Sequence, residues 1–309
     1  MDLSNWKKFC DSSDTKFLSL LSNEANQLVE TFLNKDCKNK KLQNILKGYF
    51  NKVEPKELKK KKFKDTYTIT FGDQAENNIG MQKIGTLSNK GFTCKELKQL
   101  YEKLKDEKIL EYINLSKYTE EKTDEACILI FRSVINADQL YDEQKKLNYD
   151  SKALMRGRVV NKLARHNLCF SNESQEPDYC SGKGRIISYQ DVPQLHQLLL
   201  KLPIIFGDKA KDLVAEGNHY YDIKKNGIGF HGDGERKKVI AIRLGASMPF
   251  HFQWFQNSKP IGTRIKLILN HGDMYIMSEK AVGFDWKKRK IPTLRHAAGS
   301  EKYLTIKKK

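Results

Sequence analysis

The chain has 309 residues, 39% of them hydrophobic, which is enough for a sizeable core in one or two domains. Its formal net charge of +18 favours polyanionic partners, with nucleic acid first, although a solvated lysine-rich surface explains the same charge. The N-terminus lacks the apolar core of a signal peptide, and no run of 18 apolar residues is present to span a membrane. Six cysteines without a C-x-x-C pair fit reduced thiols, so we expect an intracellular protein of the nucleus or cytoplasm that is not secreted.

Residues 1–150 are expected to form a helix-rich, mixed α/β domain of unknown role. Apolar residues recur at helical spacing from Leu18 to Phe32, and a second helix is expected to begin near Leu42. Further elements are expected as a strand over Thr66–Phe71, a long amphipathic helix over Thr93–Leu115, a buried strand over Ala126–Phe131 and a helix ending near Leu147.

Residues 151–309 are expected to form a second domain that is rich in short strands. Glycines, aromatic residues and short apolar runs become frequent here, with one helix from about Val192 to Leu202. Strands are expected over Arg185–Tyr189, Asn218–Asp222, Val239–Leu244, Phe250–Phe255, Arg264–Leu269, Asp273–Met277, Thr293–Ala297 and Tyr303–Lys307. Many short strands at this spacing indicate a sandwich or barrel, so the fold class of the whole chain is predicted to be α+β.

The sharpest chemical signal is the motif His231-Gly232-Asp233. On a strand, two side chains separated by one residue lie on the same face, so this imidazole and this carboxylate can bind one metal ion. His296 is the candidate for a third ligand, because several strands of a barrel lie between it and the motif. Two histidines and one carboxylate that leave coordination positions open are typical of non-haem Fe(II) oxygenases. His-x-Asp alone is a weak motif, since most histidines are packed or at the surface.

From about Asn218 to Lys307, the chain resembles the catalytic core of the AlkB-type branch of the Fe(II)- and 2-oxoglutarate-dependent dioxygenases. The motifs that carry the resemblance are Asn218-x-Tyr220, His231-x-Asp233, Glu235, the turn His271-Gly272-Asp273, and His296. The resemblance implies a C-terminal double-stranded β-helix, or jelly roll, over residues 151–309. It also implies Fe(II), 2-oxoglutarate and O2 as cofactor and cosubstrates.

The same resemblance implies roles for individual residues. The catalytic metal ligands are then His231, Asp233 and His296. Asn218 and Tyr220 are expected to contact the cosubstrate, with Tyr221 as an alternative to Tyr220, and Glu235 is expected to contact the substrate base.

The end of the chain departs from the family pattern. The family closes with Arg-x-Asn-x-Thr-x-Arg, and here Glu301-x-Tyr303-x-Thr305-x-Lys307 stands in its place. Lys307 is expected to bind a carboxylate of 2-oxoglutarate as a point charge, without the fork of an arginine. Alternatively, Lys307 belongs to a basic tail, and Lys302, Arg243 or Arg264 binds the carboxylate.

Two basic segments favour a nucleic-acid substrate. Arg158 and Arg165 lie where AlkB-type proteins carry their substrate-recognition lid, and Trp286 precedes four consecutive cations in the loop Ala281–Leu294. Structural ion pairs and a packed tryptophan are the alternative explanations. The expected activity is demethylation or hydroxylation of a nucleic-acid base, in repair or regulatory modification. A prolyl- or lysyl-type protein hydroxylase and a non-catalytic nucleic-acid-binding jelly roll remain the alternatives.

Overall fold

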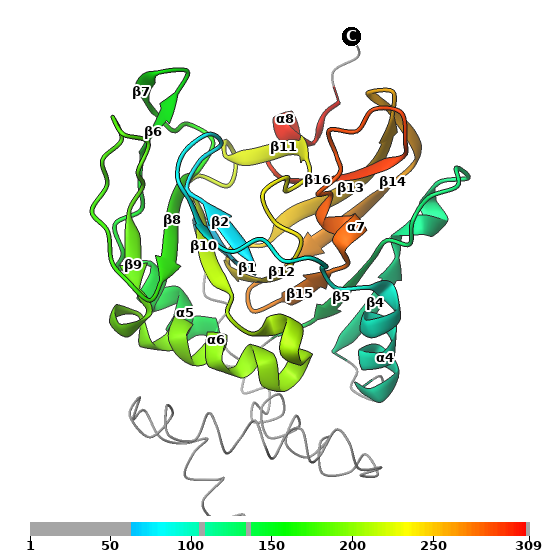
Figure 1. The fold of residues 1–309 in the computed structure, drawn as a ribbon, viewed down its shortest axis with the longest axis horizontal. Coiled ribbons are helices and arrows are strands. Elements are labelled where there is room, and N and C mark those ends of the chain that lie inside the picture. The colour runs from blue at the N-terminus through cyan, green and yellow to red at the C-terminus, as the bar shows by residue number, and fades with distance from the viewer. Residues whose placement is uncertain (1–62, 105–108, 134–136, 307–309) are drawn as a thin grey trace, which may run out of the picture. The chain divides into compact units, whose positions relative to one another are not determined.

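The computed structural model describes residues 63–104, 109–133 and 137–306 (Figure 1). The chain divides into two compact units, Met1–Gly48 and Tyr49–Lys309, and every described residue belongs to the second unit. The described part is mixed α+β, with most strands in two large, mainly antiparallel sheets and few helices. The helix expected from Leu18 to Phe32 and the one expected to begin near Leu42 lie outside the described residues.

The larger sheet has eight strands and contains segments from both halves of the chain. Its order is β4 (Leu110–Asn114), β5 (Cys127–Phe131), β15 (Met274–Met277), β12 (Val239–Gly245), β1 (Thr66–Gly72), β10 (Val214–Tyr220), β8 (His166–Ser171) and β9 (Ile186–Ser188). Strand β1 pairs antiparallel with β10 on one side and with β12 on the other. The chain is therefore not divided near residue 150, because strands from both sides of that position share this sheet.

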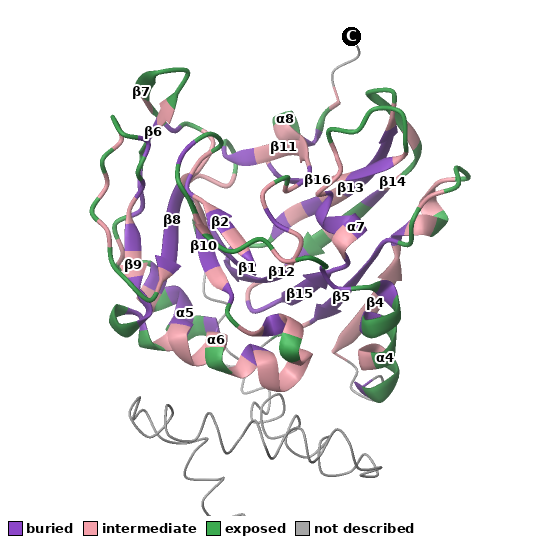
Figure 2. Cartoon of the chain, in the orientation of Figure 1, coloured by how far each residue is buried: buried purple, intermediate pink, exposed green. Residues whose placement is uncertain are grey.

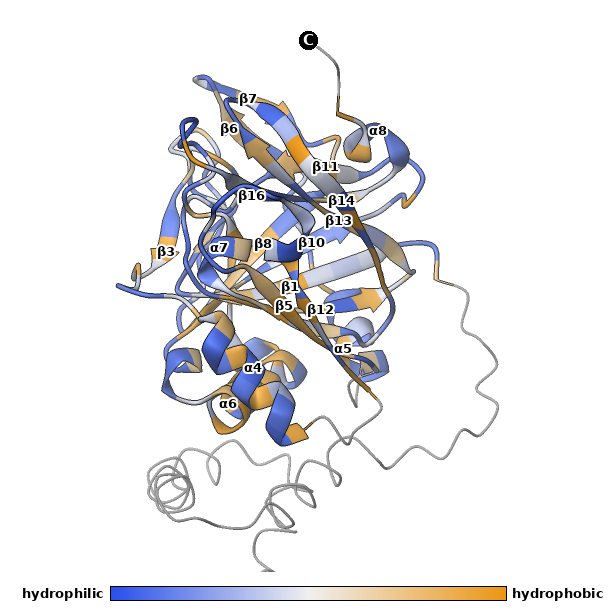
Figure 3. Ribbon diagram, turned by 90° about the vertical axis from the view of Figure 1, so that its right-hand side faces the viewer, coloured by the Kyte–Doolittle hydropathy of each residue, from blue (hydrophilic) through white to orange (hydrophobic). Residues whose placement is uncertain are grey.

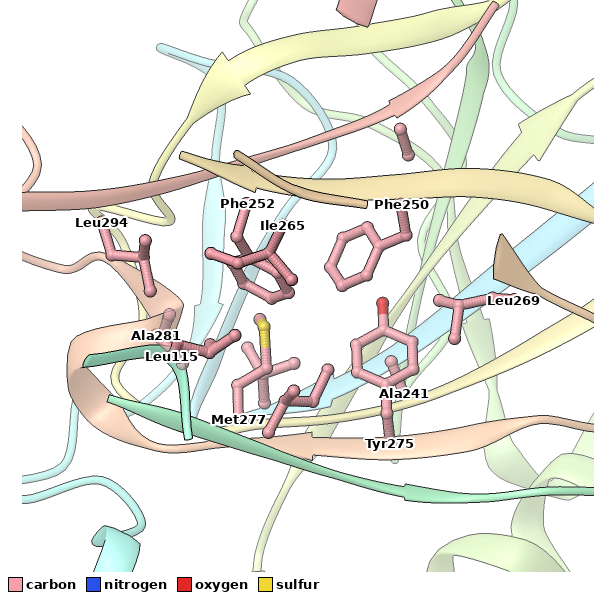
Figure 4. Close-up of a cluster of buried hydrophobic side chains, with 14 of the residues drawn as sticks. Leu115, Ala241, Phe250, Phe252, Ile265, Leu269, Tyr275, Met277, Ala281 and Leu294 are labelled. Carbon is pink, nitrogen blue, oxygen red and sulfur yellow. The ribbon is translucent and has the colours of Figure 1, made fainter. Parts of the chain in front are cut away.

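The smaller sheet has four strands and packs face to face with the larger one. Its order is β11 (Gly227–His231), β16 (Thr293–Gly299), β13 (Met248–Gln256) and β14 (Lys259–Leu269). The core between the sheets is apolar, with Ala241 and Met277 from the larger sheet against Phe252 and Leu294 from the smaller one (Figure 4). Trp254 is fully buried in this core, and its indole Nε1 donates a hydrogen bond to the Leu115 carbonyl (2.9 Å).

Helices cover the outer face of the larger sheet, on the side away from the smaller sheet (Figure 1). They are α4 (Cys94–Leu104), α5 (Ala137–Gln144) and α6 (Pro193–Phe206). Outward-facing aromatic rings of the sheet pack on them, as Phe131 does on Phe206 (5.6 Å between ring centroids) and Tyr67 on Tyr141 (5.7 Å). The hydropathy colouring shows apolar positions on these helices beside hydrophilic ones, as expected for helices with one buried side (Figure 3).

The remaining elements are short. They are the hairpin strands β2 (Gln74–Glu76) and β3 (Lys83–Gly85), the hairpin strands β6 (Lys152–Met155) and β7 (Arg158–Asn161), the helices α7 (Glu279–Val282) and α8 (Glu301–Leu304), and the 3-10 turns Leu115–Tyr118, Tyr189–Asp191 and Asp208–Ala210. The β6–β7 hairpin is largely exposed, whereas the strands of the two sheets are mostly buried (Figure 2). Among the described residues, no helix combines the length and apolar character needed to cross a membrane.

Two elements differ from the prediction. The helix expected over Thr93–Leu115 ends at Leu104, and Leu110–Asn114 forms strand β4 instead, because the edge of β5 supplies its backbone hydrogen bonds. The strand expected over Tyr303–Lys307 is also wrong, since residues Glu301–Leu304 form helix α8. Strands are confirmed at the other expected positions, with shifted ends, and so is the helix that begins near Val192.

Candidate metal centre

Strand pairing in the smaller sheet brings His231 and His296 together. His231 is the last residue of β11 and lies directly opposite His296 of β16, with 4.5 Å between the ring centroids. Asp233 follows two residues beyond the end of β11, where its backbone N–H donates to the Val282 carbonyl (3.0 Å). The three residues expected as ligands therefore meet at one end of this strand pair.

The donor atoms of the His231–Asp233–His296 cluster converge on one point. Asp233 Oδ1 lies 3.4 Å from His231 Nε2 and 3.4 Å from His296 Nε2, and all three donor atoms lie within 4.8 Å of one another. Two metal bonds of about 2.1 Å that meet at roughly 90–110° place their donor atoms about 3.0–3.4 Å apart. The cluster therefore fits a single divalent first-row metal ion.

Backbone carbonyls fix the tautomer of His231. Its Nδ1 lies 2.8 Å from the Gly229 carbonyl oxygen and 3.1 Å from that of His296. Because a carbonyl oxygen only accepts, Nδ1 carries a proton, which leaves Nε2, on the side of Asp233, as the ring nitrogen that can bind a metal ion. These contacts also fix the orientation of the imidazole ring.

The charges around Asp233 keep it ionised. Burial alone raises the pKa of this carboxyl, but hydrogen bonds with His231 and His296 and the nearby Arg236 guanidinium hold the pKa well below its usual range. Burial, and then the neighbouring His231, lower the pKa of His296. The cluster thus presents one carboxylate and a neutral His296 near pH 7, as metal binding requires.

Gly232 leaves no room for a side chain between the two ligands. A Cβ at this position would lie 2.2 Å from the Gly283 carbonyl oxygen and 2.7 Å from the Cβ of Trp286. Gly283, at φ +77, ends helix α7 in the left-handed region that favours glycine. The turn that carries Asp233 is therefore packed directly against the end of α7.

Behind the cluster lies a buried ionic network around Arg236. This guanidinium is 3% exposed and pairs with Glu216 of β10 and with Glu235 (Nη2 to Oε1, 2.7 Å), while its Nε lies 3.7 Å from Asp233 Oδ2. Burial raises the pKa of Glu235, and Arg236 partly opposes this effect. Glu235, expected to contact a substrate base, thus already has a salt-bridge partner in this structure.

The residues expected to contact a cosubstrate lie on the inner face of β10. Asn218 and Tyr220 are directly opposite Thr68 and Thr66 of β1, and the Tyr220 ring is buried beside the Arg243 guanidinium (5.8 Å). Tyr221 faces away, and its hydroxyl donates to the Leu163 carbonyl (3.1 Å). The position of Tyr220 therefore suits the expected role better than that of Tyr221.

The four cations expected as candidates to bind a carboxylate of 2-oxoglutarate do not lie together in one site. Lys307 lies outside the described residues. Lys302 is exposed on α8, and Arg264 donates to the Leu304 carbonyl (2.9 Å) and stacks on Phe230. Among these alternatives, only Arg243 is on the inner face of the larger sheet, since it lies opposite Thr68.

The residues expected to bind substrate are not gathered at one point. Arg158 is exposed on the β6–β7 hairpin, whereas Arg165 is half-buried and donates from Nε to the side-chain oxygen of Asn218. Trp286 is half-buried beside the turn of Asp233, with the Arg295 guanidinium over its ring (5.3 Å). Arg165 and Trp286 therefore have structural contacts in addition to any role with substrate.

Sequence reasoning missed Arg236, Glu216 and Thr68 and ranked Arg243 behind Lys307. One signal for Arg243 is present in the sequence, because it is the single charged residue in the apolar run Val239–Leu244. An arginine in a run that reads as a buried strand is costly without a partner, and so points to a site.

The fold and the cluster define a mixed α+β protein with a candidate centre for one divalent metal ion. No known protein-family profile matches the chain. An uncharacterized protein, R156, of Acanthamoeba polyphaga mimivirus is 48% identical over 250 residues, which cover 78% of this chain and 98% of the viral protein. The chain belongs to the family of this mimivirus protein.

Proposed function

We propose that the protein is an AlkB-like, Fe(II)- and 2-oxoglutarate-dependent dioxygenase that demethylates or hydroxylates a nucleic-acid base. The convergence of His231, Asp233 and His296 carries the proposal, because two histidines and one carboxylate are the donor set of this enzyme class. Fe(II) held by these three residues would supply the oxidative chemistry of this class, in which one atom of O2 enters succinate as 2-oxoglutarate loses CO2, and the other is inserted into a C–H bond of the substrate.

The strand order supports a jelly roll. From β10 to β16 the chain passes between the larger and the smaller sheet, with β10, β12 and β15 in the first and β11, β13, β14 and β16 in the second. A double-stranded β-helix has this alternation and needs an eighth strand between β10 and β12. Here β1 fills that position, although it precedes the other strands in sequence. Because β1 fills the position of the eighth strand, residues 301–307 are not needed there. This explains why they depart from the closing motif of the family.

The chain's own residues orient the reacting groups in this proposal. The Gly229 and His296 carbonyls hold His231 in the binding tautomer, and Arg236 holds the outer oxygen of Asp233. Phe250, whose ring centroid lies 5.8 Å from that of His296, closes the apolar side of the centre and limits the access of water. Glu235 and the Trp286 ring lie beside the turn of Asp233, where an extruded base would enter.

The distribution of positive charge supports a nucleic-acid substrate. Lys287, Lys288, Arg289 and Lys290 are all exposed, and they follow Trp286 directly. The β6–β7 hairpin presents Arg156 and Arg158 beside the exposed side chains of Met155 and Val159. The segment that follows the hairpin is joined to the strand that carries His231, since Ala164 O accepts from the N–H of Gly227, where β11 begins. Cations interleaved with apolar groups suit a single strand of nucleic acid.

The test is succinate formation from 2-oxoglutarate by protein loaded anaerobically with Fe(II) and then exposed to oxygen. Reactions are run alone, with methylated DNA and RNA oligonucleotides, and with a peptide mixture. We expect stimulation by one nucleic-acid pool, no turnover by His231→Ala, and full turnover by His251→Ala, whose side chain lies on the outer face of β13. Stimulation by peptides alone would support a protein hydroxylase, and folded protein without any turnover would support the non-catalytic alternative.

A further inference from the structure

Arg243 is a buried cation without a counter-ion. It lies on β12 with its side chain between the two sheets, and it is 1% exposed. Its Nη1 donates only to the Met248 sulfur (3.3 Å), and its Nε is buried with no hydrogen-bond partner. Within the described part of the chain, no carboxylate forms an ion pair with it, and Glu216 on the same face of the sheet is paired with Arg236.

Such an arginine is unfavourable in the protein as it stands. A guanidinium does not lose its proton in a protein, so burial cannot be relieved by neutralisation. A buried charge is retained where a partner of opposite charge compensates it. The position of Arg243 therefore indicates an anion that binds from outside the chain.

The surroundings of Arg243 supply further hydrogen-bond donors. Thr68 lies directly opposite it on β1, and its buried hydroxyl has no partner among the described residues. Tyr220 lies beside the guanidinium, and Tyr275 belongs to the same inner face, opposite Ala241. Two guanidinium nitrogens and these hydroxyls suit the two oxygens of one carboxylate, which accepts several hydrogen bonds.

This group of donors and the metal centre share the same interior region. The Phe250 ring lies near both groups: its centroid is 5.8 Å from that of His296 in the metal centre and 5.2 Å from that of Tyr275 among the donors. Figure 4 shows the Tyr275 hydroxyl pointing from the larger sheet toward Phe250 on the smaller one. One small molecule with an anionic group at each end thus has binding partners at both of its ends.

We propose that Arg243 and Thr68 bind the distal carboxylate of the 2-oxo diacid whose other end binds the metal. The inference rests on the proposed function, and it replaces the expected role of Lys307. Strand β1 occupies the place of the closing strand and offers Thr66, Thr68 and Thr70 on its inner face, without a cation. The cation comes from the neighbouring strand β12 instead.

The test is calorimetric binding to protein loaded with Mn(II) under anaerobic conditions. The two ligands are 2-oxoglutarate and 2-oxopentanoate, which has the same chain length without the distal carboxylate. We expect the native protein to prefer the diacid by roughly 100-fold, because losing one partner of a buried charge pair has an effect of this size. Arg243→Met should bind both ligands alike, Arg243→Lys should keep part of the preference, and Arg264→Met should behave as the native protein does.

The outcomes separate this inference from the proposed function. If Arg243→Met binds Mn(II) and keeps the full preference for the diacid, the Arg243 inference is wrong and the proposed function stands. If the native protein binds Mn(II) but neither 2-oxo acid, the Arg243 inference and the proposed function are both wrong about the cosubstrate. Failure to bind Mn(II) at all would remove the proposed function. If Arg243→Met does not fold, Arg243→Lys and Thr68→Val are used instead. If both of these variants prefer 2-oxoglutarate over 2-oxopentanoate as strongly as the native protein does, the proposed contact is wrong.

Discussion

Gly232 and Gly283 are packed backbone against backbone, so closely that a Cβ on Gly232 would lie 2.2 Å from the carbonyl oxygen of Gly283. The two residues belong to different parts of the fold, since Gly232 precedes a candidate ligand and Gly283 ends helix α7. Asp233 adds a hydrogen bond from its N–H to the Val282 carbonyl. The position of the carboxylate is therefore set by the end of α7 as much as by strand β11.

This contact predicts the effect of Gly232→Ala. The added methyl group must displace either the end of α7 or the turn of Asp233, at a cost of about 1–3 kcal/mol in unfolding free energy. We expect lower thermal stability and at least roughly 10-fold weaker Mn(II) binding, measured by calorimetry. Gly234→Ala is the matched control, because its Cβ would make only ordinary contact with Trp286 (3.4 Å). Equal metal binding by the two variants would contradict the packing argument.

Removal of a ligand should weaken metal binding strongly without unfolding the protein. We expect His296→Ala to lose at least roughly 100-fold in Mn(II) affinity, because one of only three protein donors is missing. Free Mn(II) in equilibrium with the protein, measured by electron paramagnetic resonance, gives the affinity. His251→Ala serves as control, since His251 lies on the outer face of β13. A His296→Ala protein that binds the metal normally would exclude the proposed centre.

Arg243→Met should stabilise the protein when no anion is present. Replacing an uncompensated buried guanidinium with an apolar side chain of similar length removes its desolvation cost, and we expect a gain of about 1–3 kcal/mol. Urea unfolding in buffer without carboxylates measures this gain. Millimolar 2-oxoglutarate with Mn(II) should then stabilise the native protein and leave Arg243→Met almost unchanged. A destabilised Arg243→Met protein would show that internal contacts already compensate the charge.

Lys162 should make stability rise with pH. Burial lowers the pKa of this amine to about 8, although Asp150 acts in the opposite direction. Between about pH 8 and 10.5 the unfolded chain holds a proton that the folded chain has released, so the free energy of unfolding increases by about 3 kcal/mol over this range. The gain is lost as pH falls toward 8. Urea unfolding from pH 7.5 to 10 should show this rise in unfolding free energy in the native protein but not in Lys162→Met. Lys152 is exposed, so Lys152→Met is the control and should show the same rise as the native protein.

The four cations after Trp286 should contribute to nucleic-acid binding through phosphates. Replacing Lys287, Lys288, Arg289 and Lys290 with glutamine should weaken binding to a single-stranded oligonucleotide and reduce the salt slope by up to roughly 3. Fluorescence anisotropy at several salt concentrations measures both effects. Glutamine at Lys95, Lys98 and Lys103 of α4 removes three exposed charges elsewhere and should change the slope little. An equal loss in both variants would indicate a general charge effect.

Local patterns in the sequence were sufficient to predict most of the strands and to single out the three candidate ligands. Alternation over Thr66–Phe71 and the spacing of His231 and Asp233 depend on neighbouring residues only, so both could be predicted. The partner of a strand is a long-range property, and no local pattern places β1 between β10 and β12. For the same reason β4 was predicted as helix, since Tyr112 and Ile113 become strand residues only by pairing with β5. Lys307 was favoured over Arg243 because a closing strand was expected at the chain end.

The central place of β1 has a consequence for the order of events during synthesis. Thr68 pairs with Asn218 and Arg243, which leave the ribosome 150 and 175 residues later. The strand that completes the middle of the sheet is thus among the first segments made and must wait, unpaired, for both of its neighbours. Folding dominated by such distant contacts is slow and exposes strand edges to other chains in the meantime. We therefore expect the newly made chain to depend on chaperones until β12 has been synthesised.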